Sequence, residues 1–573
     1  MVRSKAVRLS SLRVLGFFMW VAFLILGISE HFLWFIPAGF IGWFFLWLIQ
    51  QFNAAKDQES IYLALQSIEE RKKSRKDRML SGLEEGMEFA DKTHPFSGDL
   101  DLFGAHSLFQ LINHTTSEGG RQKLADLLKA DFETQQAKMR QSGVRELTGK
   151  PEFLQSQEAV GLAFSKESGS KISWEKWIDE PERVSAIHWI LALLGPLGGM
   201  TWLILIWFGL LPQAWLGVWI ILGVLMLSRV FQPLKKAADH IPSTSQMKSM
   251  ALRSQMIEEE KFDSTGLCEA QSPFTAGGKP ISAQIRNLDR LGLWVQNRLN
   301  LLYLPFNLLF WTDFILLLSL SKWKKKAGTS LRLLPEYLQE WEVWVSLGSF
   351  EVEVGYPGTV TWTEETILSA DQIVHPLIHP EKAIANSCSL GANPKLILLT
   401  GANMSGKTTF MRTLGINAVI VNLGLRPFAK ELVIGPFQLY TSMRNADNLG
   451  ESVSSFYAEL HRIKSLIGRL VSGERIFFLL DEILKGTNTQ DRISGSKALI
   501  HQILQTPGFG MISTHDIELS ELGKTEESIR NFSFHSEIRD ETIQFDYKLK
   551  KGPCPSFNAH KLMELMGIRF EGN

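Results

Sequence analysis

The chain has 573 residues, and this length alone indicates three or four domains rather than one. Hydrophobic residues make up 45% and charged residues 21%, which suits globular parts together with some membrane segments. Lysine plus arginine equals aspartate plus glutamate at 60 each, so no global basic charge indicates a nucleic-acid partner, although a neutral sum still permits a local basic face. No CxxC pair occurs among the three cysteines, which argues against a zinc site or a disulfide framework: Cys268, Cys388 and Cys554.

Two apolar runs near the N-terminus predict a membrane hairpin. They cover residues 14–28 and 32–49, and each is close to the roughly 17 to 25 residues that a helix needs to cross the hydrocarbon core. Basic residues precede the pair and follow it, and positive charge on both flanks predicts that both ends lie in the cytoplasm. A cleaved signal peptide is the alternative for the first run. Residues 26–29 make a poor cleavage site, and a second span follows at once, which favours the hairpin.

A second hairpin is predicted in the middle of the chain. Residues 186–208 and 214–231 are apolar, the turn signal Leu211-Pro212-Gln213 separates them, and basic residues lie on both sides. Four membrane spans, with both termini and the C-terminal region in the cytoplasm, form the simplest topology.

A fifth apolar run covers residues 299–320. It includes Asn300, Pro305 and Asp313, and a charge near the bilayer centre costs about 2.5 to 3.5 kcal/mol. An odd number of spans would also place the C-terminal region outside the cell. We therefore expect a buried core helix here, ending at the lysine cluster of residues 322–326.

A phosphate-binding loop lies between an apolar strand signal, residues 396–400, and a helix-like stretch that starts at Thr409. It has the pattern GxxxxGK[ST] and reads Gly401-Ala402-Asn403-Met404-Ser405-Gly406-Lys407-Thr408. The glycines let backbone N–H groups turn toward phosphates, and the helix N-terminus adds a partial positive charge. We expect Lys407 to reach the β- and γ-phosphates of ATP and the Thr408 hydroxyl to bind Mg²⁺.

Two more strand signals end in reactive side chains. The strand at 475–482 ends in Asp481-Glu482, where the aspartate of P-loop ATPases supports Mg²⁺ and the glutamate polarises the attacking water. The strand at 510–516 reaches His515, which can sense a γ-phosphate by hydrogen bonding. A chance glycine-rich turn or a structural histidine would explain each motif alone. Three such strand ends in this order favour an ATPase.

These motifs resemble the ATPase of the MutS mismatch-repair family, a branch of the ABC class. The resemblance covers residues 401–408, 447–460, 481–491 and 513–515, continues in the tail at 551–568, and extends weakly to 99–124, which is similar to the start of the MutS core domain. Three residues depart from the pattern: Ala402 stands where proline is usual, and Ser405 and Arg492 stand where glycine is usual. None of these departures removes a catalytic group.

The resemblance implies a homodimer with two composite ATP sites. Ser454, in the segment that looks like the family's signature, would reach the γ-phosphate held by the partner subunit. Asn403 would lie close to the phosphates, and Thr487, Asn488 and Thr489 would form the loop that links the two sites. The expected catalytic residues are therefore Lys407, Ser454, Glu482 and His515, with Thr408 and Asp481 as metal ligands.

The sequence thus predicts an α/β P-loop ATPase of the ABC class at the C-terminus, joined to an α-helical core and lever with two transmembrane hairpins. The predicted segments are hairpin one at 1–52, a charged, solvated cytosolic linker at 53–95, the helical core at 96–180, hairpin two at 181–233, the second part of the core with the lever at 234–345, and the ATPase at 346–573.

The sequence leaves the partner of this ATPase open. A hairpin and a linker occupy the place of the mismatch-reading domain in repair proteins, and residues 234–345 leave little room for a DNA clamp. One interpretation is a membrane-tethered ATPase that binds DNA of a structure other than a simple mismatch. The other is an ATP-driven clamp on a membrane or protein partner. The basic clusters at 71–78 and 322–326 suit the phosphates of DNA or of anionic lipid. A degenerate, scaffolding ATPase is a third option, against which the intact carboxylates and lysine argue.

Overall fold

A computed structural model describes residues 2–164, 174–180, 184–276, 279–300, 303–443, 455–539 and 542–555. The chain divides into two compact units, each assembled from segments that are distant in the sequence. Unit 1 comprises Met1–Glu70, Glu152–Phe262 and Cys268–Glu342; unit 2 comprises Arg71–Pro151, Asp263–Leu267 and Val343–Asn573.

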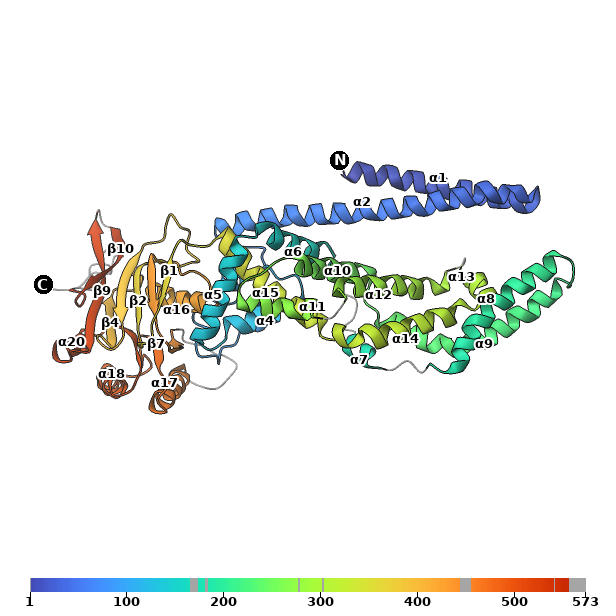
Figure 1. Cartoon of the computed structure of the whole chain (residues 1–573). Coiled ribbons are helices and arrows are strands. Elements are labelled where there is room, and N and C mark those ends of the chain that lie inside the picture. The colour runs from blue at the N-terminus through green and yellow to red at the C-terminus, as the bar shows by residue number, and fades with distance from the viewer. Residues whose placement is uncertain are drawn as a thin grey trace. The chain divides into compact units, whose positions relative to one another are not determined.

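Unit 1 is built from helices, shown in blue to yellow-green in Figure 1. In chain order they are α1 (Val2–Ser29), the 3₁₀ helix η1 (Phe32–Trp34), α2 (Phe35–Lys76), α6 (Pro151–Phe164), α7 (Trp174–Asp179), α8 (Ala186–Trp207), α9 (Ala214–His240), α10 (Thr244–Glu259), α11 (Thr265–Thr275), α12 (Ile281–Gln296), η3 (Asn297–Leu299), α13 (Tyr303–Phe310), α14 (Thr312–Leu331) and α15 (Leu334–Glu353). The ends of α2, α11 and α15 fall in unit 2.

Within the described residues, four helical stretches are long and apolar enough to cross a membrane. They are Val7–Ser29, Phe32–Lys76, Ala186–Trp207 and Ala214–His240, the same four runs that the sequence predicts. Many large apolar side chains on these helices are exposed. Phe18, Trp43 and Leu193, for example, are each about two-thirds exposed. Exposed apolar surface on this scale marks contact with lipid or with another protein.

The expectation of one continuous helix over residues 299–320 is wrong. The run divides into α13 and α14, which are bent by 88° at Trp311, a residue with a positive φ of 49°. Asn307 explains the break, because its side-chain oxygen accepts hydrogen bonds from the Asp313 amide and the Thr312 hydroxyl and so caps α14. Arg298 donates two hydrogen bonds to the Asp313 carboxylate, at 2.9 and 2.6 Å, and this buried pair fixes the cap. The helix α14 then continues through the lysine cluster to Leu331.

The bent pair packs against the second hairpin through a close approach of backbone and rings. A Cβ atom at Gly223 of α9 would lie 2.7 Å from the carbonyl oxygen of Leu308, so only glycine fits there. The Trp219 ring stacks on Trp311 with centroids 4.5 Å apart, and its Nε1 donates to the Leu309 carbonyl at 2.8 Å. The helices α8, α9, α13 and α14 therefore form one bundle within unit 1.

Two sheets form the centre of unit 2. The larger has the order β10-β9-β4-β8-β7-β6, in which only the β9–β10 pair is antiparallel. Its strands are β4 (Leu396–Gly401), β6 (Gln438–Ser442), β7 (Ile476–Asp481), β8 (Phe509–Thr514), β9 (Ile529–Arg539) and β10 (Thr542–Lys551). The smaller has the order β1-β5-β2-β3 and comprises β1 (Thr359–Trp362), β2 (Leu368–Ile373), β3 (Asn386–Leu390) and β5 (Glu431–Ile434).

Helices cover both faces of the larger sheet, as expected for parallel strands made almost entirely of buried apolar residues. On one face, alternate strand residues such as Leu398 and Phe478 pack with α17 (Ser455–Val471) and α18 (Thr489–Leu504). The other face meets α16 (Lys407–Asn422), nearly all of which is buried. The remaining elements of unit 2 are η2 (Met87–Phe89), α3 (Leu108–Ile112), α4 (Glu118–Leu128), α5 (Thr134–Thr148), α19 (Ile517–Ser520) and α20 (Leu522–Thr525).

The sequence predicts that the basic cluster at 71–78 is solvated, but the structure buries part of it. Arg75 and Arg78 are buried. Arg75 donates to the Asn113 carbonyl at 2.5 Å and pairs with Glu353, whereas Arg78 donates to the Pro376 carbonyl at 2.6 Å. These two arginines join distant segments of unit 2.

Candidate functional site

The loop between β4 and α16 is shaped to wrap a phosphate chain. Gly401 and Gly406 have φ angles of 150° and 105°, and a Cβ at Gly401 would lie 2.7 Å from the Phe534 carbonyl oxygen. The buried Lys407 ammonium points into the loop, where it donates to the Gly401 and Ala402 carbonyls at 2.9 and 3.0 Å. Burial lowers the pKa of Lys407, so an anionic partner in the loop would stabilise its charged form.

The loop residues fit a polyphosphate in a second respect. Among the described residues, the Ser405 hydroxyl is buried without a hydrogen-bond partner, and a buried polar group of this kind calls for one. Asn403 and Met404 are exposed at the tip of the loop, and Thr409 lies in the first turn of α16.

Two oxygen ligands suitable for Mg²⁺ meet beside the loop. The Thr408 hydroxyl donates to Asp481 Oδ2 at 2.6 Å, and the Ser513 hydroxyl donates to Asp481 Oδ1. Because β8 lies between β4 and β7, the carboxyl ends of three neighbouring parallel strands bring these residues together. Hydroxyl and carboxylate oxygens are the ligands that Mg²⁺ prefers, so the pair fits this ion.

Glu482 is held between two partners. Its Oε1 lies 2.8 Å from His515 Nε2, and its Oε2 lies 2.7 Å from Lys485 Nζ. The hydrogen bond with His515 and the Lys485 ammonium lower the pKa of Glu482 to about 2, against the opposing effect of burial. The Glu482 amide also donates to the Ser513 carbonyl at 3.1 Å, which fixes the strand end. The site therefore contains a carboxylate with a lowered pKa next to a histidine.

A comparison with protein families identifies this arrangement. Residues 397–568 match the family model of MutS domain V. The C-terminal region is a MutS-type ATPase domain. MutS domain V is an ABC-type ATP-hydrolysing domain, so the protein is an ATPase, and the P-loop α/β fold predicted from the sequence is confirmed.

The MutS-type domain thus brings several predicted catalytic and metal-binding side chains together around one P-loop: Lys407, Thr408, Asp481 and Glu482. His515, also predicted, contacts Glu482. The predicted signature serine, Ser454, lies outside the described residues, as do most of the segment 447–460 and the closing helix after residue 555. The linking loop at 487–489 leads into α18, where the Asn488 side chain caps the helix by accepting from the Asp491 amide.

The helix α17, which begins inside the signature segment at Ser455, packs directly on the catalytic strand end. Glu459 accepts a hydrogen bond from the Leu484 amide, two residues after Glu482, and burial raises the pKa of Glu459. A side chain at Gly486 would collide with Phe456. The start of α17 and the loop after Glu482 are therefore positioned together.

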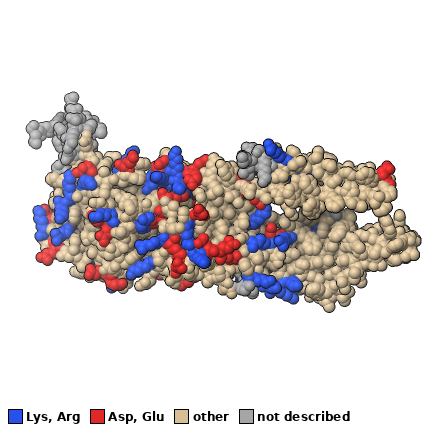
Figure 2. Space-filling model, turned by 45° about the horizontal axis from the view of Figure 1, so that its top comes forward, with Lys and Arg blue, Asp and Glu red and all other residues tan. Residues whose placement is uncertain are grey.

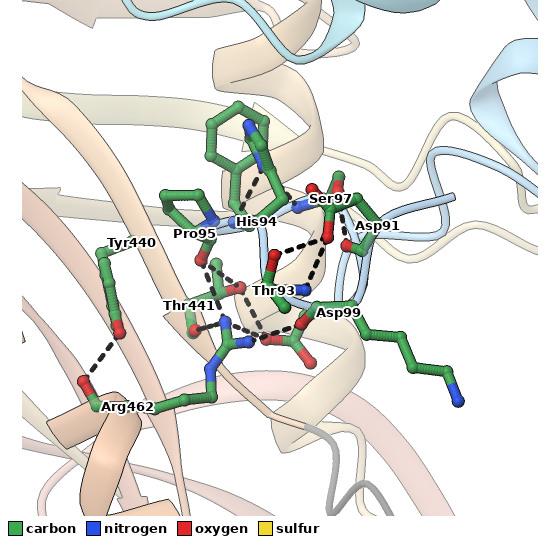
Figure 3. A network of polar contacts seen from close by, with 11 residues as sticks. Asp91, Thr93, His94, Pro95, Ser97, Asp99, Tyr440, Thr441 and Arg462 are labelled. Atoms are coloured by element: carbon green, nitrogen blue, oxygen red, sulfur yellow. Dashed lines mark hydrogen bonds and ion pairs between the residues drawn. The ribbon is translucent and has the colours of Figure 1, made fainter. Parts of the chain in front are cut away.

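A polar network, shown in Figure 3, fixes α17 to the segment 91–99. Arg462 donates to the Thr441 carbonyl at 2.6 Å and to the Pro95 carbonyl at 3.2 Å, and it lies 3.7 Å from the Asp99 carboxylate. The buried Thr441 hydroxyl donates to Asp99 at 2.7 Å. Tyr440 closes the network by donating to the Arg462 carbonyl at 2.7 Å. The strand β6, which precedes the signature segment, and the helix α17, which begins inside it, are thus held by the same polar network.

The sequence did not reveal a cavity of about 210 Å³ beside the P-loop. Its lining includes Ile384, Asn386, Phe410 and Tyr547, together with Gly406 of the loop itself. The Tyr547 ring lies against Gly406, and Asn386 joins β10 to β3 by donating to the Tyr547 carbonyl at 3.0 Å and accepting from the Leu549 amide. An aromatic and aliphatic cavity next to a phosphate loop suits a flat nucleobase.

Proposed function

We propose that this protein is a membrane-anchored ATPase that binds and hydrolyses ATP at two composite sites of a homodimer, and that this cycle is coupled to DNA binding. The observation that supports the catalytic part most strongly is the convergence of Lys407, Thr408, Asp481, Glu482 and His515 at three adjacent strand ends of a MutS-type domain. Every group that phosphoryl transfer to water requires in cis has a residue there.

The catalytic residues act in sequence around the bound nucleotide. Lys407 gives up its hydrogen bonds to the Gly401 and Ala402 carbonyls and donates to the β- and γ-phosphates instead. Thr408 and Asp481 would hold Mg²⁺, which would supply positive charge beside the phosphates. Glu482, ionised throughout the physiological pH range, orients the attacking water, and His515, whose Nε2 contacts Glu482, senses the γ-phosphate beside it. The cavity between Ile384 and Tyr547 takes the adenine ring.

ATP acts as a clamp in this proposal. Ser454 of each subunit completes the site of the other, so two bound ATP molecules join the homodimer and hydrolysis releases it. The contacts of α17 with the loop after Glu482 support this proposal, because they tie the helix next to Ser454 to the catalytic strand end.

The hairpins α1–α2 and α8–α9 anchor the protein in the membrane, with both termini and the ATPase in the cytoplasm. The surface in Figure 2 supports this: the part at the right, where Figure 1 places α8, α9 and the α1–α2 turn, is almost free of charged side chains, and lysines and arginines gather where this part ends. Positive charge at the cytoplasmic ends of spans is what membrane insertion selects.

One observation favours a second function, an ATP-driven clamp on a membrane or protein partner without DNA. Away from the edge of the apolar part, the described residues on the face that Figure 2 shows have lysines and arginines interspersed with aspartates and glutamates. A protein that follows a phosphate backbone has a continuous basic stripe instead.

A salt titration of DNA binding separates the two functions. Detergent-purified full-length protein is tested with duplex, mismatched and branched DNA, with and without ATP, beside Lys407→Ala as the variant that cannot respond to ATP. A DNA clamp making six to ten phosphate contacts loses on the order of 10³- to 10⁵-fold in affinity between 50 and 200 mM salt, and its affinity changes with ATP only in the wild type. Absence of binding at low salt, beside intact ATP hydrolysis, rejects DNA coupling and supports the second function.

A further inference from the structure

Arg492 and Asp516 form a bidentate ion pair at the rim of the ATP site. Arg492 Nε donates to Asp516 Oδ2 at 2.9 Å, and Nη2 donates to Oδ1 at 2.8 Å. The arginine side chain is 27% exposed and the aspartate 15% exposed, so water only partly screens the pair. Two parallel hydrogen bonds between charged groups fix the orientation of both side chains as well as their distance.

The pair joins the start of α18 to the loop after β8, and both segments lie next to catalytic residues in the chain. Arg492 lies in the first turn of α18, whose N-terminal cap, Asn488, is bound to Asp491 through both its oxygen and its nitrogen. Asp516 lies two residues after the end of β8, and its amide donates to the Thr514 hydroxyl at 3.0 Å. The loop that follows Glu482 and the loop that follows β8 are therefore connected through this pair.

His515 stands immediately before Asp516 in the chain. Its ring is one-third exposed and makes a 2.8 Å contact with Glu482 through Nε2. The loop that carries this ring is anchored from α18 by Arg492, whose two hydrogen bonds go to the residue next to His515.

We propose that Arg492 is a positioning residue for ATP hydrolysis: through Asp516 it holds His515 within hydrogen-bonding reach of Glu482. Both hydrogen bonds described for the Arg492 guanidinium go to Asp516, so we assign its contribution to the geometry of the loop. The proposal rests on the roles given above to Glu482 and His515. It also predicts that a movement of α18 at the linking loop, residues 487–489, changes the alignment of the catalytic pair.

The test compares steady-state ATP hydrolysis by full-length Arg492→Gln and Arg469→Gln. Arg469 is a matched control, because it also binds one carboxylate through two nitrogens, that of Glu474, has a side chain that is 26% exposed and lies on α17 at the opposite end of β7. Glutamine keeps the helix propensity at both positions. A misplacement of about 1 Å can cost 10²-fold in rate, and we expect kcat of Arg492→Gln to fall by about 10-fold or more with KM changed less than about twofold.

Further variants make each outcome decisive. Arg492→Lys should recover part of kcat, and Asp516→Asn should reproduce the loss without changing the size of the side chain. A kcat of Arg492→Gln or Asp516→Asn equal to that of Arg469→Gln overturns the proposal, as does a loss confined to KM. Glu482→Gln, measured in parallel, tests the underlying assignment: if hydrolysis survives it, the role of Glu482 fails, whatever Arg492→Gln does.

Discussion

His375 is a buried histidine in the wall of the nucleobase cavity, and burial lowers its pKa to about 4 from an ordinary value of 6.5. The unfolded chain therefore takes up a proton at a pH where the folded chain does not. Between pH 6.5 and pH 4 this difference destabilises the fold as pH falls, by at most about 3 kcal/mol.

The prediction is that the thermal unfolding midpoint of the ATPase domain falls between pH 6.5 and pH 4.5, and falls less in His375→Gln. Glutamine keeps a neutral polar side chain of similar length, so it removes the titration and little else. The measurement is a set of melting curves on both proteins in detergent at matched ionic strength. Equal slopes for the two proteins would show that His375 does not carry the effect.

At the scale of elements, the sequence determines the catalytic strands because each is a short, largely apolar run that ends at or next to a residue of the site. Gly401, Asp481 and His515 could therefore be assigned in advance, and parallel pairing then brings them together. Neither the cavity at Tyr547 nor the break at Trp311 had such a signal. The first depends on β10 meeting β3, a pairing of residues far apart in the chain, and the second depends on Arg298 and Asn307 binding the start of α14.

The packing of the α13–α14 pair on α9 leads to a prediction with an internal control. Gly223 and Gly217 lie on the same helix, but a Cβ at Gly223 would lie 2.7 Å from the Leu308 carbonyl and 2.8 Å from Trp311 Nε1, whereas one at Gly217 meets nothing within 4 Å. Overpacking of this kind costs about 1 to 3 kcal/mol. We expect Gly223→Ala to lower the melting temperature in detergent and Gly217→Ala to leave it unchanged or raise it. Equal melting temperatures would contradict the bundle described for unit 1.

For the whole molecule, the proposed topology predicts which loops face the outside. Cys268 is exposed, whereas Cys388 and Cys554 are buried, so a Cys268→Ser background is suited to labelling with a thiol reagent that cannot cross membranes. New cysteines at His31 and Gln213, at the two hairpin turns, should react in intact cells, and a cysteine at Lys325 of α14 should react only after lysis. Labelling of Lys325→Cys from outside would mean that the bent α13–α14 pair crosses the membrane as a fifth span.

The proposed dimer clamp depends on a residue that acts in trans, because Ser454 of each subunit completes the ATP site of the other. Glu482→Gln keeps the nucleotide site but removes the carboxylate that orients water, a change that costs about 10²- to 10⁴-fold in groups of this kind. With ATP and Mg²⁺, this variant should accumulate as a long-lived dimer in size-exclusion chromatography with light scattering, whereas the wild type should return to its starting state as ATP is consumed. Adding Ser454→Ala to Glu482→Gln should shorten the dimer lifetime, because each subunit then lacks its contact with the partner's γ-phosphate. If neither wild type nor Glu482→Gln changes its oligomeric state with ATP, the role of Ser454 in trans is wrong and ATP acts within one subunit.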